Sequence, residues 1–231
     1  MERHLDDELE KFTKNLLKMA TLTEESLQEC IAALQNRNKK LAEKVIQNDN
    51  RIDEFENIIE EQAIELHALF QPMAVDLRFI SAGQHISTEL ERAADLIVNI
   101  AQRIVEGQDQ VPVQVIREIT QLAHHAREMV TKSIDAFLKQ DDRMAQDIIL
   151  ADKTSNKLRT EIFNELIEDY IKAGGDAAIG GLTLILITRD LERIADHATA
   201  IAEEVIYLKR AKMIKHHLDD LQGGLTNGEA I

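Results

Sequence analysis

The sequence contains one six-residue phrase twice, as Leu90–Asp95 (LERAAD) and as Leu191–Asp196 (LERIAD). The two copies lie 101 residues apart and share five of their six residues. The similarity extends upstream, where apolar positions in 31–49 align with those in 134–152 at a constant offset of 103. This internal duplication constrains the fold strongly, because it predicts two copies of one structural unit.

Each copy has the pattern of three long helices. Between Leu5 and Met19, apolar residues recur at spacings of four and three, which places them on one face of a helix. The residue before a proline is disfavoured in a helix, so the second helix is expected to end before Gln71 and Pro72. We expect helices at about 6–34, 41–70, 72–106, 113–139, 142–173 and from 176 to beyond Lys215.

The predicted fold class is therefore all-α, with two tandem antiparallel three-helix bundles built from six long helices. The composition agrees, since the chain has only two prolines, no tryptophan and 3% aromatic residues. We assign the first repeat to residues 1–107, the second to 113–222, and a disordered tail to 223–231. The segment Gly107–Pro112 is the predicted linker between the repeats.

The charge of the chain limits its partners and its location. A formal net charge of −15 argues against a nucleic-acid surface, which needs clustered Lys and Arg. The single cysteine, Cys30, suggests a reducing compartment. The N-terminus lacks the apolar core of a signal peptide, and the apolar run Ala177–Ile187 is too short to cross a bilayer. We expect a cytoplasmic protein that meets a membrane only through its partners.

Each copy of the repeated phrase carries two acidic residues four positions apart, Glu91 with Asp95 and Glu192 with Asp196. On a helix this spacing stacks both carboxylates on one face. Like charges at this spacing destabilise an isolated helix slightly. A bound cation is the simplest compensation for a repeated cost of this kind.

Counting back from the expected turn at Pro72 places more carboxylates against the first acidic pair. Asp53 falls opposite Glu91, and Asp49 falls opposite Asp95. Carboxylates that project from facing helices are how bundles bind iron, manganese or magnesium. The first repeat is therefore a candidate metal site with four carboxylates.

The second repeat offers a poorer set. Asp152 falls opposite Asp196, but Asn156 takes the position opposite Glu192. If both repeats bind metal, the two sites are expected to differ in affinity.

Other classes of site have little support. The chain has no Glu-x-x-His, His-Glu-x-x-His or Cys-x-x-Cys motif and no phosphate-binding glycine loop, so we expect no enzyme. Charged rows on helices are usually only solvated faces. A metal-free interaction bundle, whose acidic rows contact basic partner surfaces, therefore stays open as an alternative.

Two further segments have no assigned role. In the stretch Gln71–Arg78, Asp76 suits the start of a helix, and Arg78 has acidic neighbours with which it could pair. This pattern is typical of a well-specified turn between helices. The basic segment Lys209–Lys215 has no functional interpretation.

These motifs together resemble the PhoU family of bacterial regulators. The resemblance rests on the two three-helix repeats, the Gln-Pro-x-x-x-Asp-Leu-Arg turn at Gln71–Arg78, the two Glu-Arg-x-x-Asp motifs and the run Glu192–Val205. It implies a cytoplasmic negative regulator of the phosphate-starvation response that contacts a phosphate transporter's ATPase and a sensor histidine kinase. It also implies a homodimer.

The resemblance further implies a multinuclear cluster of iron, zinc or another divalent cation on the acidic motifs, that is, on Glu91, Asp95, Glu192 and Asp196. Asp49, Asp53 and Asp152 are added from the spacing argument alone. The second repeat lacks the turn motif, so any function of that turn belongs to the first repeat. An accessory protein of a low-affinity phosphate carrier is a further alternative, because such proteins share the bundle and similar motifs.

Overall fold

The structure is a computed structural model that describes residues 2–107 and 116–211 of the chain. Every regular element in these two ranges is helical, which confirms the predicted all-α class. The first repeat comprises α1 (Glu2–Asn36), α2 (Lys39–Asn48), α3 (Asn50–Phe70) and α4 (Val75–Gly107); the second comprises α5 (Ile116–Lys139), α6 (Asp142–Leu166), the π-helix η1 (Ile167–Ile171) and α7 (Gly175–Arg210).

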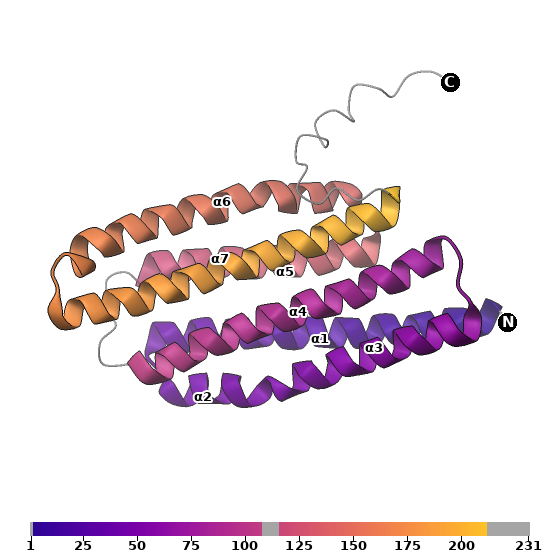
Figure 1. Ribbon diagram of the computed structural model, residues 1–231, viewed down its shortest axis with the longest axis horizontal. Helices are drawn as coiled ribbons and strands as arrows, with labels where there is room; N and C mark the ends of the chain where they lie inside the picture. The colour runs from indigo at the N-terminus through magenta and orange to yellow at the C-terminus, as the bar shows by residue number, and fades with distance from the viewer. Residues whose placement is uncertain (1, 108–115, 212–231) are drawn as a thin grey trace, which may run out of the picture.

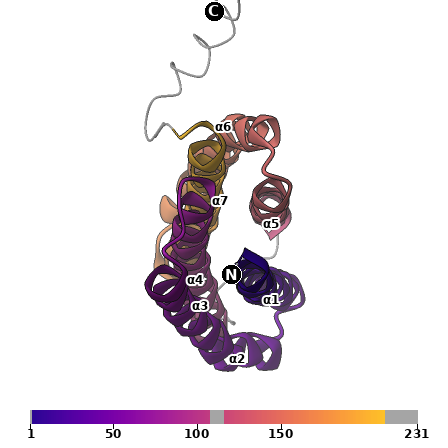
Figure 2. The same ribbon diagram turned by 90° about the vertical axis from the view of Figure 1, so that its right-hand side faces the viewer.

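The helices run side by side along the long axis of the molecule (Figure 1). Seen end-on, α3, α4, α7 and α6 form one curved row, and α1 and α5 lie together beside it (Figure 2). The two repeats meet where α4 packs against α7 and where α1 packs against α5. The predicted pair of tandem three-helix bundles is therefore one continuous assembly. None of the described helices is long and apolar enough to span a membrane.

The duplication is visible in the turn between the first two helices of each repeat. Arg37 and Gln140, which are 103 residues apart, both adopt a left-handed conformation with φ of 51° and 48°. The next residues, Asn38 and Asp141, both cap the following helix by accepting hydrogen bonds from its first backbone N–H groups. The same local solution at the same offset shows that one structural unit was used twice.

Three helix boundaries differ from the sequence-based expectation. The second helix is interrupted at Asp49, within the Asn-Asp-Asn sequence 48–50, since such residues favour caps over helix interiors. Helix α4 begins at Val75 rather than Pro72, because Gln71 and Ala74 are both left-handed. The fifth helix ends in η1, where the close approach of Tyr170 leaves no room for a side chain at Gly181.

The last helix also ends earlier than expected. Helix α7 stops at Arg210, because Ala211 is left-handed and its N–H donates to the Tyr207 carbonyl at 2.8 Å. The Arg210 side chain holds this end against α6 through an ion pair with Asp142 at 2.6 Å. The segment 212–215, the linker 108–112 and the tail 223–231 lie outside the described residues.

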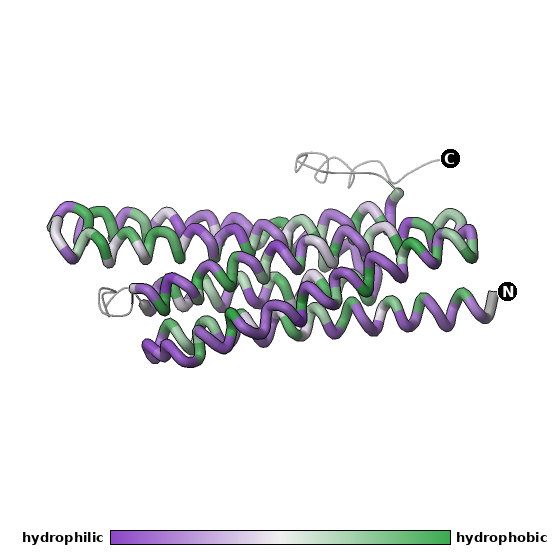
Figure 3. Tube along the Cα trace, turned by 60° about the horizontal axis from the view of Figure 1, so that its bottom comes forward, coloured by the Kyte–Doolittle hydropathy of each residue, from purple (hydrophilic) through white to green (hydrophobic). Residues whose placement is uncertain are grey.

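One hydrophobic core serves both repeats. Hydrophobic and hydrophilic residues alternate along each helix, as expected for helices with one buried face (Figure 3). Phe12 of α1 packs edge-on against Phe79 of α4, which stacks on Phe137 of α5 with ring centroids 4.9 Å apart. Phe12 and Phe137 are fully buried, so aromatic packing crosses the boundary between the repeats.

The α4–α7 contact also contains buried charges. Asp190 of α7 is 1% exposed and forms an ion pair with Arg103 of α4. Glu204 of α7 is 5% exposed and lies 3.2 Å from Nδ1 of His85. Each buried carboxylate on one helix thus faces a basic side chain on the other, and this fixes the antiparallel alignment of α4 and α7.

The substitution Arg103→Met is expected to destabilise the fold by about 3 kcal/mol, because among the described residues it leaves the buried Asp190 with Arg189, at 3.8 Å, as its remaining ion-pair partner. Denaturant unfolding measures the change. Lys172→Met is the control: its pair with Glu168 is exposed, so the loss should stay below about 1 kcal/mol. Equal small effects of both substitutions would contradict the structural role of the Arg103–Asp190 pair.

Candidate metal centre

The antiparallel packing of α3 and α4 brings four predicted carboxylates together. Asp49 and Asp53 lie at the start of α3, and Glu91 and Asp95 lie in the middle of α4. Loss of solvation raises the pKa of Asp49 to about 6, with further contributions from the charges of Asp53 and Asp95. Each carboxylate therefore lies within the electrostatic reach of others on the facing helix, as the spacing predicts.

Glu91 is the most strongly perturbed member of this set. Partial burial raises its pKa to about 7, and the charges of Asp95, Glu56, Asp53 and Asp49 add to the shift in that order. Free of metal, Glu91 thus holds a proton more tightly than an ordinary glutamate. A cation bound at this position would favour the ionised carboxylate and so lower that pKa.

Glu56 is a fifth carboxylate, which the counting argument missed. It lies on α3, three residues after Asp53. Partial burial raises its pKa and the charges of Glu60 and Asp53 add to the shift, while a hydrogen bond with Thr88 and the charge of Arg92 reduce it. Counting from the turn matched residues only at equal distances along the two helices. A search for residues three or four positions from Asp53 would have found it, because such residues share a helix face.

The second repeat places its residues in the same way but with different contacts. Burial raises the pKa of Asp196 to about 6, and the charges of Glu192 and Asp152 add to this shift. Asn156 donates a hydrogen bond of 2.8 Å to one carboxylate oxygen of Asp152. The other oxygen of Asp152 is buried and accepts no hydrogen bond. This one carboxylate oxygen of Asp152 does not by itself form a metal site.

Arg159 is the residue of the second repeat that the sequence argument overlooked. It lies on α6, and its Nε is 3.1 Å from a carboxylate oxygen of Glu192 on α7. Its guanidinium also lies over the ring of Phe163, 5.5 Å from the centroid. Glu192 therefore already has a positive partner from the chain itself.

The donor chemistry of the two repeats differs. In the first repeat, none of the five carboxylates forms an ion pair within the described ranges, and oxygen-rich sets of this kind suit hard divalent cations. Arg92, beside Glu91 in the sequence, pairs with Glu89 instead. Throughout 2–107 and 116–211, no three His, Cys, Asp or Glu side chains are already gathered around one metal position. The first repeat fits a cation by its chemistry, and its side chains would have to converge to hold one.

The remaining residues singled out in the sequence have structural contacts. Within 2–107 and 116–211 no acid forms an ion pair with Arg78; its Nε donates to the Leu208 carbonyl of α7 at 3.3 Å and thus connects the start of α4 to the end of α7. Asp76 is partly buried in the first turn of α4. His197, next to Asp196, donates from Nδ1 to Glu89 of α4 at 2.6 Å.

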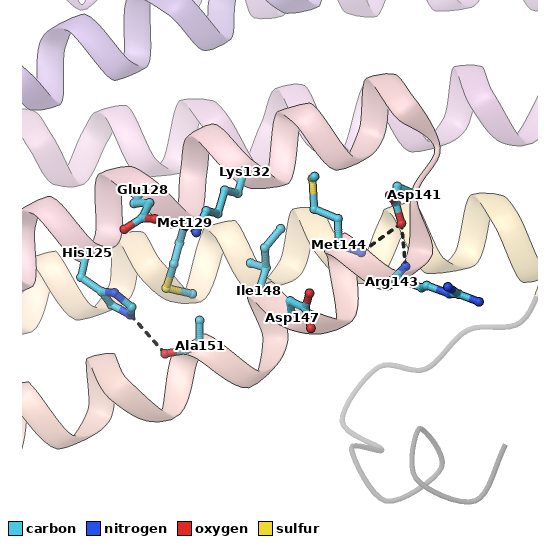
Figure 4. Close-up of a pocket in the computed structure, with 10 residues that line it drawn as sticks. All are labelled: His125, Glu128, Met129, Lys132, Asp141, Arg143, Met144, Asp147, Ile148 and Ala151. Atoms are coloured by element: carbon cyan, nitrogen blue, oxygen red, sulfur yellow. Dashed lines mark hydrogen bonds and ion pairs between the residues drawn. The ribbon is translucent and has the colours of Figure 1, made fainter. Parts of the chain in front are cut away.

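A separate cavity of about 370 Å³ lies between α5 and α6 (Figure 4). Met129, Met144 and Ile148 form its apolar wall, and the His125 ring closes one end by its hydrogen bond to the Ala151 carbonyl. This cavity adjoins the second acidic set, because Ala151 precedes Asp152 and the charge of His125 acts on the Asp152 carboxylate. None of the carboxylates of the two acidic sets lines this cavity.

Comparison with known proteins gives a consistent result. The family model described as PhoU domain matches residues 16–104 and 119–205. A protein of Thermotoga maritima named phosphate-specific transport system accessory protein PhoU homolog 1 is 32% identical over 98% of both chains. A PhoU homolog of Aquifex aeolicus with the same accessory-protein name is 35% identical over 90% of this chain and 94% of its own.

Solved structures agree with the sequence relatives. The crystal structure of PhoU from Pseudomonas aeruginosa is 31% identical and superposes with a TM-score of 0.85, covering 90% of this chain and 99% of the other. The phosphate transport system regulatory protein PhoU from Streptococcus pneumoniae is 24% identical with a TM-score of 0.83, covering 91% and 99%. This second likeness is one of fold alone.

The raised pKa of Glu91 predicts a pH-dependent stability of the metal-free protein. The pKa is 4.5 for an ordinary glutamate and about 7 in the fold, so Glu91 stabilises the folded state below pH 4.5 and loses this effect as the pH rises through 7. Glu91→Gln imitates the protonated form. It should raise the melting temperature at pH 8 and leave it unchanged at pH 4.

The expected gain at pH 8 is roughly 2–4 °C, the change that about 1 kcal/mol gives in a chain of this size once partial solvation of Glu91 is allowed for. Thermal unfolding in the presence of a chelator measures it. Glu54→Gln is the control, because Glu54 is an exposed acid on the same α3 helix. An increase in melting temperature for Glu91→Gln that is the same at pH 4 and at pH 8 would contradict the raised pKa of Glu91.

Proposed function

The chain belongs to the PhoU family, and on that premise we propose that it regulates phosphate uptake as a cation-binding adaptor. In this proposal it acts from the cytoplasm as a homodimer and as a negative regulator of the phosphate-starvation response. It carries the state of the phosphate transporter, through that transporter's ATPase, to a sensor histidine kinase. The membrane is reached only through these partners.

The names of the relatives support the coarser part of this function. Proteins similar over nearly the whole chain are named accessory proteins of the phosphate-specific transport system. These names give the relatives an accessory role in phosphate transport. The adaptor role and its two partners extend this description to a mechanism.

The carboxylate cluster of α3 and α4 is the observation that carries cation binding. Asp49, Asp53, Glu56, Glu91 and Asp95 would hold the cation, either a single ion or a cluster of iron, zinc or another divalent metal. A bound cation would neutralise charges that now repel one another. Because the carboxylates come from two helices, neutralisation would also draw α3 and α4 together and change the surface that partners meet.

The metal-free alternative draws support from one observation. In the described residues the side chains do not already surround a metal position. An acidic surface of this kind could instead contact a basic partner surface directly. The two functions differ in their response to conditions: direct charge contacts weaken with salt, whereas a cation-dependent surface is lost with chelator.

Protein purified without chelator is expected to contain a divalent metal. The double substitution Glu91→Gln, Asp95→Asn should remove most of it, because it removes the carboxylates of α4 that face α3. Elemental analysis by mass spectrometry measures the content. The control, Glu54→Gln with Glu61→Gln, removes two exposed acids of α3 and should leave the metal in place. Equal metal content in both double variants would exclude the proposed centre.

Deletion of the gene from its host is expected to make the phosphate-starvation response constitutive, since a negative regulator is lost. A phosphate-responsive reporter measures this in phosphate-rich medium, and the wild-type gene restores repression. A deletion strain that still represses the reporter, but takes up less phosphate through a low-affinity carrier, would favour the carrier-accessory alternative.

A further inference from the structure

We propose that Arg159 takes the place of a cation in the second repeat, so that the second acidic motif is closed to divalent metal by the chain itself. The proposal refines the function proposed above, because it confines cation binding to the first repeat. It can nevertheless be tested on the second repeat alone.

The alignment of the two repeats determines which residue of the first repeat corresponds to Arg159. The offset of 103 continues along α3 and α6, since the buried residues of one helix fall on those of the other: Ile52 on Ser155, Ile59 on Ile162 and Ala63 on Leu166. At this offset Asp53 corresponds to Asn156, and Glu56 corresponds to Arg159. At these two positions α3 therefore has two acids, whereas α6 has an amide and a base.

Corresponding contacts have opposite sign in the two repeats. In the first, the charge of Glu56 acts on Glu91 as a repulsion. In the second, Arg159 lies 3.1 Å from Glu192 as an attraction. In the first repeat the pKa of Glu56 stays raised although the charge of Arg92 lowers it, whereas the second repeat has the positive charge of Arg159 at the corresponding position.

The guanidinium of Arg159 has two contacts, an ion pair with Glu192 and a cation–π contact with Phe163, although its buried Nε forms no hydrogen bond with the described residues. The Arg159 and Glu192 side chains are 32% and 15% exposed, so their attraction is less screened than that of a surface pair. Phe163, one turn further along α6, supports the guanidinium by a cation–π contact. The residue that corresponds to Phe163 in the first repeat is Glu60, so this support exists only in the second.

This arrangement disfavours a divalent cation for two reasons. First, Glu192 would have to exchange the guanidinium for the metal, and the approaching ion would be repelled by a charge that is never lost by deprotonation. Second, Asp152 already accepts a hydrogen bond from Asn156, which provides no charge. Three carboxylates and one guanidinium replace the five carboxylates of the first repeat.

The test gives the second repeat the residues of the first. In a background that carries Glu91→Gln and Asp95→Asn, the double substitution Asn156→Asp, Arg159→Glu recreates the five residue types of the α3–α4 cluster between α6 and α7. Mn²⁺ is the probe, followed by calorimetry and by its electron paramagnetic resonance signal. We expect no binding in the background and clear binding after the double substitution.

Two further variants complete the experiment. Lys157→Glu is the control, because it reverses a charge on α6 at a side chain that is 75% exposed and pairs only with Glu161 of the same helix; it should create no Mn²⁺ site. The reciprocal change in the first repeat of the otherwise unaltered chain, Asp53→Asn with Glu56→Arg, should abolish binding there.

The outcomes separate this inference from the proposed function. Mn²⁺ binding in the background that is lost with Glu192→Gln, Asp196→Asn would overturn the inference, since Arg159 would then not exclude metal. So would a folded Asn156→Asp, Arg159→Glu variant, judged by its helical circular dichroism, that binds none. If the unaltered protein binds no Mn²⁺ but the converted second repeat does, the inference holds and cation binding in the proposed function fails.

Discussion

The antiparallel packing of α4 against α7 is the contact on which the rest of the molecule depends. It joins the two repeats through a shared apolar core and through buried acids that each need a basic partner on the other helix. The pair Arg103–Asp190 illustrates the constraint, because Asp190 is 1% exposed and burying a carboxylate costs free energy that its ion pair offsets. Once this contact is fixed, the outer helices α3 and α6 can only pack on either side of the central pair, and each then faces one copy of the repeated acidic motif.

The two repeats solve one electrostatic problem in different ways. Each presents Glu-x-x-x-Asp from its last helix toward the preceding helix, and partial burial makes the negative charges costly in both. In the first repeat, burial raises the pKa of Glu91 to about 7, and the acids on the facing helix add to the shift. The second repeat adds Arg159, which pairs with Glu192. The two repeats thus share a backbone arrangement and differ in the charges that surround the acidic motif.

Most of the fold could be predicted because its causes are local or repeated. Helix periodicity, the scarcity of proline and the duplication were sufficient for the class, the two bundles and the approximate helix ranges. Boundaries were wrong where the backbone responds to neighbours, as at η1 against Gly181 or at the left-handed Ala211 that ends α7. The four facing carboxylates of the first repeat were predicted because equal distances from a tight turn bring residues together. Glu56 and Arg159 were missed because side chains on adjacent turns also converge, and equal counting ignores them.

The sequence by itself determined that the chain folds as a duplicated helical bundle and that acidic pairs recur at equivalent positions. Those properties follow from spacing along the chain, which a sequence records directly. The tertiary structure decided what surrounds each acidic pair: which carboxylates lose solvent, which repel one another and which find a guanidinium. Arg78 shows the same division, since its neighbours in sequence suggest an acidic partner, whereas the fold brings the Leu208 carbonyl to it from 130 residues away. Charge balance depends on distances between helices, and those exist only after packing.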